Sequence, residues 1–259
     1  MLASSTPDAL WEAPSTRLLR PAAVACRDLR NGTGRRRLLD GVTLSVPVGA
    51  RLLVVSQPAS SASLLLRILA GIARPDGGEI SLAGLADPSL EGWRQRVGFV
   101  ERDPGIPTWL SPREALGLAA RLYGMEALAA ERAIDGAASR AGVGGTELER
   151  PILRGGRALM ERVAFASALI GEPEVLLLDE PLHSLDPARR AAMLALPGRR
   201  RTVLLASRHP AAEAGLCTHA ALLSDGRLAL VTPIARLATE ELPLSVEGLE
   251  TLAKRSPRR

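Results

Sequence analysis

The sequence predicts an α/β protein with an inserted helical region, and three observations support this class. Residues 174–178 (EVLLL) and 202–206 (TVLLA) are unbroken apolar runs, typical of parallel strands covered by helices on both faces. Strand-like and helix-like segments alternate in this half of the chain. At 54–71 (VVSQPASSASLLLRILAG) a strand-like run meets eight small or turn-prone residues and then an apolar helix pattern, the layout of a phosphate-binding loop.

The first part of the chain, up to about residue 100, reads as short strands around one helix. Turns that contain glycine or proline separate the strands. The helix pattern at 63–72 (SLLLRILAGI) directly follows the phosphate-type loop. The expected strands are 23–29, 42–46, 51–55, 79–84 and 97–100.

A helical region is expected from Ser111 to about residue 170. Its first segment places Ser111 at the N-cap, Pro112 at the first helical position and Glu114 three residues after the cap, which is a capping-box pattern. Strands and helices then alternate over 174–180, 187–196, 202–207, 211–217, 220–226 and 227–231.

The composition is that of a soluble globular protein with a sizeable core. Of the 259 residues, 46% are hydrophobic and 24% charged. Aromatic residues make up only 2%, so stacking platforms for single strands are scarce and we expect no nucleic-acid partner. The net charge is +5, and four of these charges come from Lys254, Arg255, Arg258 and Arg259. Such a basic tail can contact acidic lipid or nucleic acid, but we favour a disordered, solvated end.

The cysteines and the N-terminal segment favour a reducing cytosol. Cys26 and Cys217 are too few and too far apart for a disulfide framework or a metal spacing. Residues 1–20 read as a loose leader, in which Asp8 and Glu12 interrupt any apolar stretch of the signal-peptide kind. No run approaches the roughly eighteen apolar residues of a membrane span.

The most informative motif is the stretch 174–187 (EVLLLDEPLHSLDP), because its buried strand ends in two adjacent carboxylates. In this class of sheet, ligands bind beyond the carboxyl ends of the strands. Asp179 at such an end can hold Mg²⁺ in a phosphoryl-transfer site. Glu180 can then orient or deprotonate a water molecule.

Around this motif, the chain resembles the ATP-binding subunits of ABC transporters over about 24–231. The Walker B pattern matches 175–181, and the D-loop pattern matches 184–187, including Asp186. The stretches LLDGVTLSVPVGARLLVV, ILAGIARPDGGEISLAG, WRQRVGFV and LSPREALGLAARLYGM are also similar. The resemblance implies a P-loop NTPase-like ABC cassette with a mixed sheet core, an antiparallel β subdomain and an inserted helical subdomain. It places the ATPase-like domain at 21–235, the helical subdomain at about 104–160 and a C-terminal tail at 236–259.

The phosphate loop departs from the family pattern of Gly, four residues, Gly-Lys and then Ser or Thr. Ser56 and Ser61 stand at the two motif glycines, Ala62 at the lysine and Ser63 at the hydroxyl position. Glycines let backbone N–H groups curl around phosphate oxygens, and the lysine adds a positive charge. Losing one charged hydrogen bond weakens affinity about ten- to hundredfold. The implied nucleotide-binding set is Ser56, Ser60, Ser61, Ala62, Ser63 and Leu64.

Other family positions have changed as well. Arg102 falls at the coupling-loop glutamine and Arg208 at the switch histidine, although a one-residue slip would restore that histidine as His209. Without a gap, the signature motif of the family aligns with 155–159 (GGRAL). With two inserted residues, 153–156 (LRGG) becomes its relic and retains Gly155 and Gly156.

A subset of the implied chemistry remains. Ser63 and Asp179 occupy the family's two Mg²⁺-holding positions, and Glu180 occupies that of its catalytic carboxylate. The alternative, which we favour, is structural: Ser63 caps the helix that follows it, and Asp179 bonds backbone amides of the facing loop.

Two hypotheses for the function follow. The first is a cytoplasmic ATP-binding subunit at the inner face of the cell membrane, docked on a separate permease, with weak binding of ATP and Mg²⁺ and impaired hydrolysis. It would form a homodimer, or preferably a heterodimer, with a second ABC ATPase subunit. The second is a non-enzymatic pseudo-ATPase that acts as a scaffold or regulator. Soluble cassette proteins of translation or DNA repair are disfavoured, because those usually carry two cassettes or long coiled coils.

Overall fold

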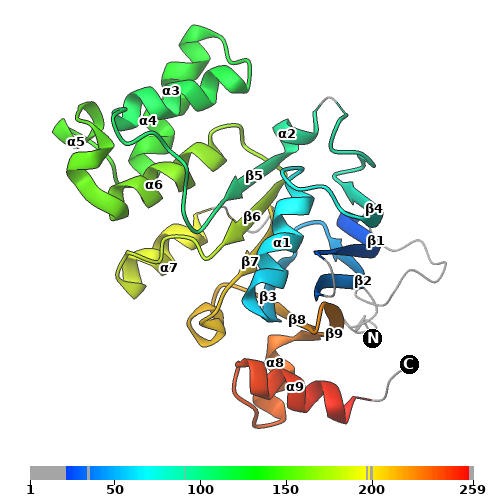
Figure 1. The fold of residues 1–259 in the computed structure, drawn as a ribbon. Helices are drawn as coiled ribbons and strands as arrows, with labels where there is room; N and C mark the ends of the chain where they lie inside the picture. Colours follow the sequence, from blue (N-terminus) through cyan, green and yellow to red (C-terminus); the bar gives the residue numbers. More distant parts are fainter. Residues whose placement is uncertain (1–21, 34–35, 91, 197, 199–200, 257–259) are drawn as a thin grey trace, which may run out of the picture.

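The computed structural model describes residues 22–33, 36–90, 92–196, 198 and 201–256, whose strands form two sheets (Figure 1). The expected leader at 1–20 and the terminal Arg258 and Arg259 lie outside the described residues. In spatial order, the larger sheet contains β5 (Val97–Val100), β6 (Val175–Asp179), β7 (Thr202–Ala206), β3 (Arg51–Gln57), β8 (His219–Ser224) and β9 (Arg227–Pro233).

The larger sheet is mixed, and its register brings several strand ends together. Strands β5, β6, β7, β3 and β8 run parallel, while β9 is antiparallel to β8. Asp179 at the end of β6 pairs with Ala206 of β7, which pairs in turn with Val54 of β3. The carboxyl ends of these strands are therefore level, at the edge where ligands bind in sheets of this class.

The smaller sheet is antiparallel and lies beside α1 (Ala59–Leu69) (Figure 1). Its strands, in spatial order, are β2 (Arg36–Pro47), β1 (Ala22–Thr33) and β4 (Gly77–Leu82). The prediction of an α/β fold with a mixed sheet and an antiparallel β subdomain is confirmed.

Both faces of the larger sheet are buried, which explains the unbroken apolar runs. Successive strand side chains point to opposite faces. Leu53 and Leu176 join the core shared with the helical region, whereas Leu52 and Leu177 join the core shared with α1 and the smaller sheet. All four are fully buried, so neither face leaves room for a polar alternation.

The helical region forms a separate lobe of the molecule in Figure 1. It begins with the predicted capping box, in which the Ser111 hydroxyl accepts from the Glu114 amide and the Glu114 carboxylate accepts from the Ser111 amide. Its elements are α3 (Pro112–Leu122), α4 (Ala127–Arg140), α5 (Thr146–Glu149), η2 (Ile152–Gly155) and α6 (Gly156–Leu169). Shorter helices elsewhere are α2 (Trp93–Arg96), α7 (Pro187–Ala195) and η3 (Pro210–Glu213).

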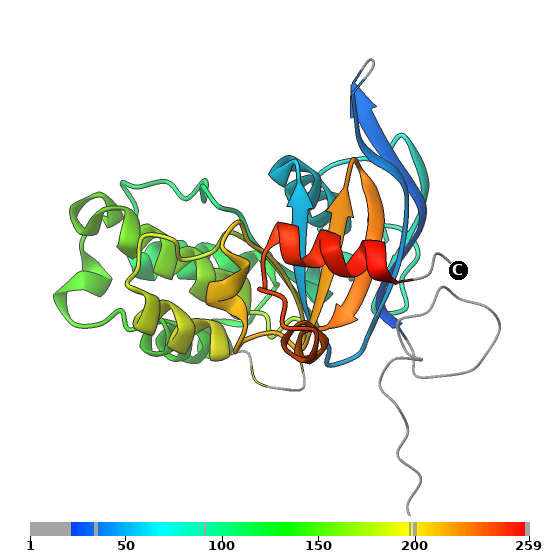
Figure 2. The same ribbon diagram turned by 90° about the horizontal axis from the view of Figure 1, so that it is seen from below.

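Much of the C-terminal tail expected at 236–259 is helical, and α9 includes Lys254 and Arg255 of the basic end that was expected to be disordered. Residues 234–255 contain α8 (Ile234–Thr239) and α9 (Val246–Arg255), and α9 packs across β3, β8 and β9 (Figure 2). Leu249 and Leu252 are one turn apart and fully buried, so one apolar stripe holds the helix to the sheet.

Candidate functional site

The phosphate-type loop contains more helix than the sequence analysis expected. Helix α1 begins at Ala59, four residues before Ser63, and its N-cap is Pro58. The predicted N-cap at Ser63 is therefore wrong. No residue from 56 to 63 adopts a positive φ. Without glycine, left-handed conformations are costly for these side chains, so the segment continues as helix instead of curling into a cradle.

Two amides of this segment are bonded within the chain. The Ser61 N–H donates to the Pro58 carbonyl oxygen at 3.0 Å, and the Ala62 N–H donates to Ser56 Oγ at 3.0 Å. A glycine-rich loop would direct such amides to phosphate oxygens. The Ser56 hydroxyl thus occupies the acceptor position of an anion at Ala62.

The predicted metal-binding pair does come together. Ser63 Oγ donates to Asp179 Oδ1 at 3.0 Å, whereas the sequence analysis favoured backbone amides as the partners of Asp179. Burial raises the pKa of the Asp179 carboxyl above its ordinary value, and the neighbouring Glu180 and Glu101 add to this. The Ser63 hydrogen bond and the positive charge of Arg102 act in the opposite direction. Mg²⁺ binds through one or two carboxylates plus phosphate oxygens, and this hydroxyl–carboxylate pair fits such an ion.

Glu180 is held by the residue at the switch-histidine position. Its Oε1 accepts from Arg208 Nε at 3.2 Å and also from the Arg208 backbone amide. The side chain of Glu180 is only 12% exposed, so the ion pair is partly shielded from water. His209 does not line the cavity around Glu180, and its amide donates to Ser207 Oγ. Of the two residues considered for the switch-histidine position, Arg208 lines this cavity and His209 does not.

These groups enclose a cavity of about 240 Å³ at the carboxyl ends of β3, β6 and β7. Of the predicted nucleotide-binding residues, two lie outside its lining: Leu64 packs against the core, and Ser61 is fully buried. Arg102 and Arg208 also line it, although the sequence analysis treated them only as replacements of family residues. The lining consists of Val54, Ser56, Ala59, Ser60, Ala62, Ser63, Arg102, Asp179, Glu180, Ala206, Ser207 and Arg208.

The signature remnant and the D-loop residue lie elsewhere. Gly155 ends η2 and Gly156 opens α6 with a φ of +66°. Asp186 caps α7 by accepting from the Arg189 amide at 2.9 Å. None of these three lines the cavity, so the chain on its own does not bring them to the other site residues.

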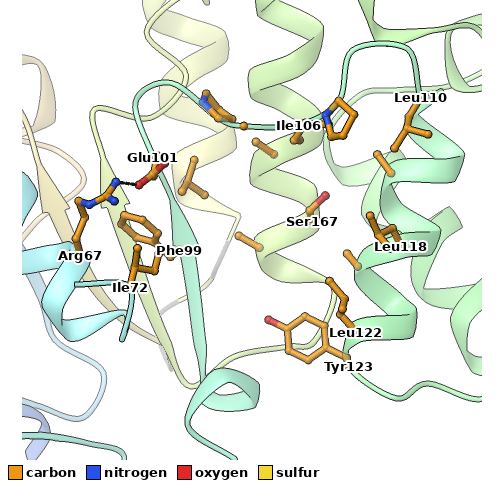
Figure 3. Close-up of a pocket in the computed structure, with 18 residues that line it drawn as sticks. Arg67, Ile72, Phe99, Glu101, Ile106, Leu110, Leu118, Leu122, Tyr123 and Ser167 are labelled. Atoms are coloured by element: carbon orange, nitrogen blue, oxygen red, sulfur yellow. Dashed lines mark hydrogen bonds and ion pairs between the residues drawn. The ribbon is translucent and has the colours of Figure 1, made fainter. Parts of the chain in front are cut away.

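A larger, mainly apolar cavity of about 520 Å³ lies between β5 and the helical region (Figure 3). Phe99 and Ile72 face it from one side, and Leu118 and Leu122 of α3 from the other. An ion pair between Arg67 and Glu101 borders it. The remaining lining residues are Val100, Pro104, Gly105, Ile106, Pro107, Leu110, Ala115, Ala119, Tyr123, Ala164, Ser167 and Ala168.

Comparison with known proteins now settles the family. Residues 39–183 match the ABC transporter family. The chain belongs to this family. It is 36% identical over 220 residues to the aliphatic sulfonates import ATP-binding protein SsuB of Pseudomonas entomophila (strain L48), covering 83% of this chain and 77% of the relative. It is 30% identical over 212 residues to the Nod factor export ATP-binding protein I of Burkholderia orbicola (strain AU 1054), covering 80% and 69%.

Solved structures of ABC cassettes share the fold. A dimeric ATP-binding cassette bound to ADP and Pi in a post-hydrolysis state aligns with a TM-score of 0.74 and 18% identity, covering 82% of this chain and 98% of that chain. An ATP-binding subunit of an ABC transporter aligns with a TM-score of 0.76 and 21% identity. The alignment covers 90% of this chain and 99% of that chain. The expected membership of the ABC ATP-binding subunits is confirmed, and this family normally binds ATP and Mg²⁺. Among the described helices, none combines the length and the apolar character needed to cross a bilayer.

Proposed function

We propose that this chain is the ATP-binding subunit of an ABC import system, on the cytoplasmic side of a separate membrane permease, with weak ATP binding and impaired hydrolysis. The observation that carries the proposal is the altered phosphate loop, in which the lysine position is Ala62 and its amide is bonded to Ser56. The similarity to aliphatic sulfonate import proteins favours import.

Weak binding follows from two losses at the loop. The missing lysine removes a charged hydrogen bond, which costs about ten- to hundredfold in affinity. A phosphate oxygen that approaches Ala62 must also displace the Ser56 hydroxyl from the amide. Ser63 and Asp179 would hold Mg²⁺, whose charge neutralises phosphate oxygens when it is bound.

Impaired hydrolysis follows from the pairing of Glu180. Glu180 Oε1 already accepts from both the backbone amide and the guanidinium of Arg208, so a water molecule must compete with Arg208 for this oxygen. The switch histidine of the family is also missing, and removing one hydrogen-bond donor to the charge that develops in the reaction slows hydrolysis by a further factor of roughly 10²–10³. The His209 side chain lies outside the cavity and does not replace this donor.

The apolar cavity is the surface we propose for the permease. Its rim exposes Ile72 at 53%, Leu118 at 41% and Leu122 at 80% of their surface. An amphipathic helix buries its apolar face in such a groove. A second ABC ATPase subunit would complete the transporter, as homodimer or heterodimer, and would bring Gly155, Gly156 and Asp186 toward the partner's nucleotide.

The test is a Mg-ATP titration of the purified full chain by calorimetry, followed by turnover assays with and without its permease. SsuB of Pseudomonas entomophila serves as the reference. We expect a dissociation constant about ten- to hundredfold weaker than that of the reference and much slower turnover. Binding and turnover equal to those of the reference would refute the proposal.

The pseudo-ATPase scaffold is the second candidate, and the bonded amides of Ser61 and Ala62 favour it. It predicts no binding heat even at millimolar Mg-ATP. A heat signal that requires Mg²⁺ and disappears in Asp179→Ala would exclude this candidate.

A further inference from the structure

The cavity at the strand ends is lined by two arginines at positions where the family pattern has uncharged side chains. Arg102 stands at the coupling-loop glutamine and Arg208 at the switch histidine. Asp179 and Glu180 also line the cavity, so its lining carries two positive and two negative formal charges. With alanine at position 62, the positive charge of the lining comes from these arginines.

The two arginines differ in what they contact. The guanidinium of Arg208 donates to Glu180 at 3.2 Å, so its charge is already paired. The Arg102 side chain is exposed and forms no ion pair among the described residues. Its charge nevertheless lies at the cavity, because Arg102 is one of the residues that line it.

The backbone of Arg102 is held from the helical region. Its carbonyl oxygen accepts from Arg157 Nη2 at 3.2 Å. The same Arg157 side chain pairs with Asp103 and with the buried Glu161. The segment after β5 is thus tied to α6, while the Arg102 side chain remains available to an anion.

We propose that Arg102 is the phosphate anchor of this site, which supplies from the end of β5 the positive charge lost at Ala62. Arginine binds phosphate oxygens through two parallel N–H donors, which suits it to this task. The cavity of about 240 Å³ is smaller than the roughly 300–1,000 Å³ of typical small-molecule pockets, so it fits a phosphate tail with the nucleoside outside. The ligand class is therefore a di- or triphosphate, an inference that rests on the proposed function.

The test is a set of calorimetric titrations with Mg-ATP and with inorganic pyrophosphate plus Mg²⁺. The full chain is compared with Arg102→Gln, Ala62→Lys and the double variant, and Arg132→Gln on α4 is the matched control for the loss of one exposed arginine. We expect Arg102→Gln to weaken the binding of both ligands about ten- to hundredfold and Arg132→Gln to leave both affinities unchanged. In the Ala62→Lys background the loss should fall to about threefold or less, because the lysine takes over the anchor. Equal melting temperatures show that the variants are folded.

Three results would overturn the inference: Mg-ATP binding unchanged in Arg102→Gln, an equal loss with and without Lys at position 62, or a loss for Mg-ATP alone. The proposed function fails separately. Tight binding and turnover like the SsuB reference, lost on Arg102→Gln, would refute impaired activity and support the anchor. No binding heat in the unmodified chain would refute both.

Discussion

Replacing Glu161 by alanine removes a carboxylate that joins α6 to the segment of His183 and Ser184. Its side chain on α6 is only 2% exposed. One oxygen accepts from the Ser184 hydroxyl at 2.9 Å and Arg157 Nε at 3.1 Å and lies 3.0 Å from His183 Nδ1; the other accepts from the Ser184 amide at 2.9 Å. Loss of Glu161 therefore releases α6 from His183 and Ser184, and it removes one partner of Arg157, the residue that also contacts Arg102 and Asp103.

The expected cost is about 2–3 kcal/mol in the free energy of unfolding. Breaking a buried charged pair costs about 3–5 kcal/mol. This figure is reduced here because Arg157 is 44% and His183 31% exposed, so water can solvate them after the change. The part-buried amide and hydroxyl of Ser184 lose their acceptor, which accounts for most of the remainder. For a chain of this size, the melting temperature should fall by about 4–12 °C.

Thermal unfolding followed by circular dichroism measures this effect. Glu161→Gln keeps the shape and part of the hydrogen bonding, so its loss should be intermediate. Glu131→Ala is the matched control, since that carboxylate is 63% exposed and its ion pair with Arg113 is worth less than about 1 kcal/mol. If Glu161→Ala melts no lower than Glu131→Ala, the buried carboxylate does not hold α6 to the segment of His183 and Ser184.

Three further predictions use the same thermal unfolding assay. Ser61→Ala should raise the melting temperature, because no described group pairs with this buried hydroxyl and its removal relieves about 1–3 kcal/mol; a decrease would contradict this. Asp179→Asn should stabilise the folded state at neutral pH, because burial raises the pKa of Asp179 and so disfavours its charged form. A raised folded pKa means that stability is lost as the pH rises, so the gain should vanish below about pH 3.9. Leu249→Ala should cost about 2–5 kcal/mol, and a loss below about 1 kcal/mol would mean that α9 contributes little.

The sequence predicted the sheet well because both of its faces are buried. Apolar runs such as 174–178 and 202–206 admit few alternatives, and the turn residues between them mark their ends. The capping box at Ser111 and Glu114 could also be predicted, because it depends on local hydrogen bonds alone. The contact between Ser63 and Asp179 was the alternative that the sequence analysis did not favour; it forms because α1 follows β3, whose carboxyl end is level with that of β6 across β7.

The start of α1 and the C-terminal helix were harder to predict for different reasons. The family pattern suggested that the helix begins at Ser63. Because the loop contains no glycine, the helix begins earlier, at Ala59. In α9, Leu249 and Leu252 lie at helical spacing, but the basic residues at the chain end suggested a solvated tail. An apolar spacing test applied to 246–255 would have indicated the packed helix.

Internal pairing explains why this site would respond weakly to nucleotide. In a glycine-rich loop the phosphates satisfy amides that the protein leaves open. Here Ser56 satisfies the Ala62 amide, and Arg208 satisfies Glu180, so the free chain already has these bonds. A ligand gains only the difference between its own contacts and those it displaces. At a concentration equal to its dissociation constant, Mg-ATP would stabilise the fold by about 0.4 kcal/mol, which is too little to register clearly as a thermal shift. Direct calorimetry on the Arg102 and Ala62 variants is therefore the measurement that can separate a weakened site from a lost one.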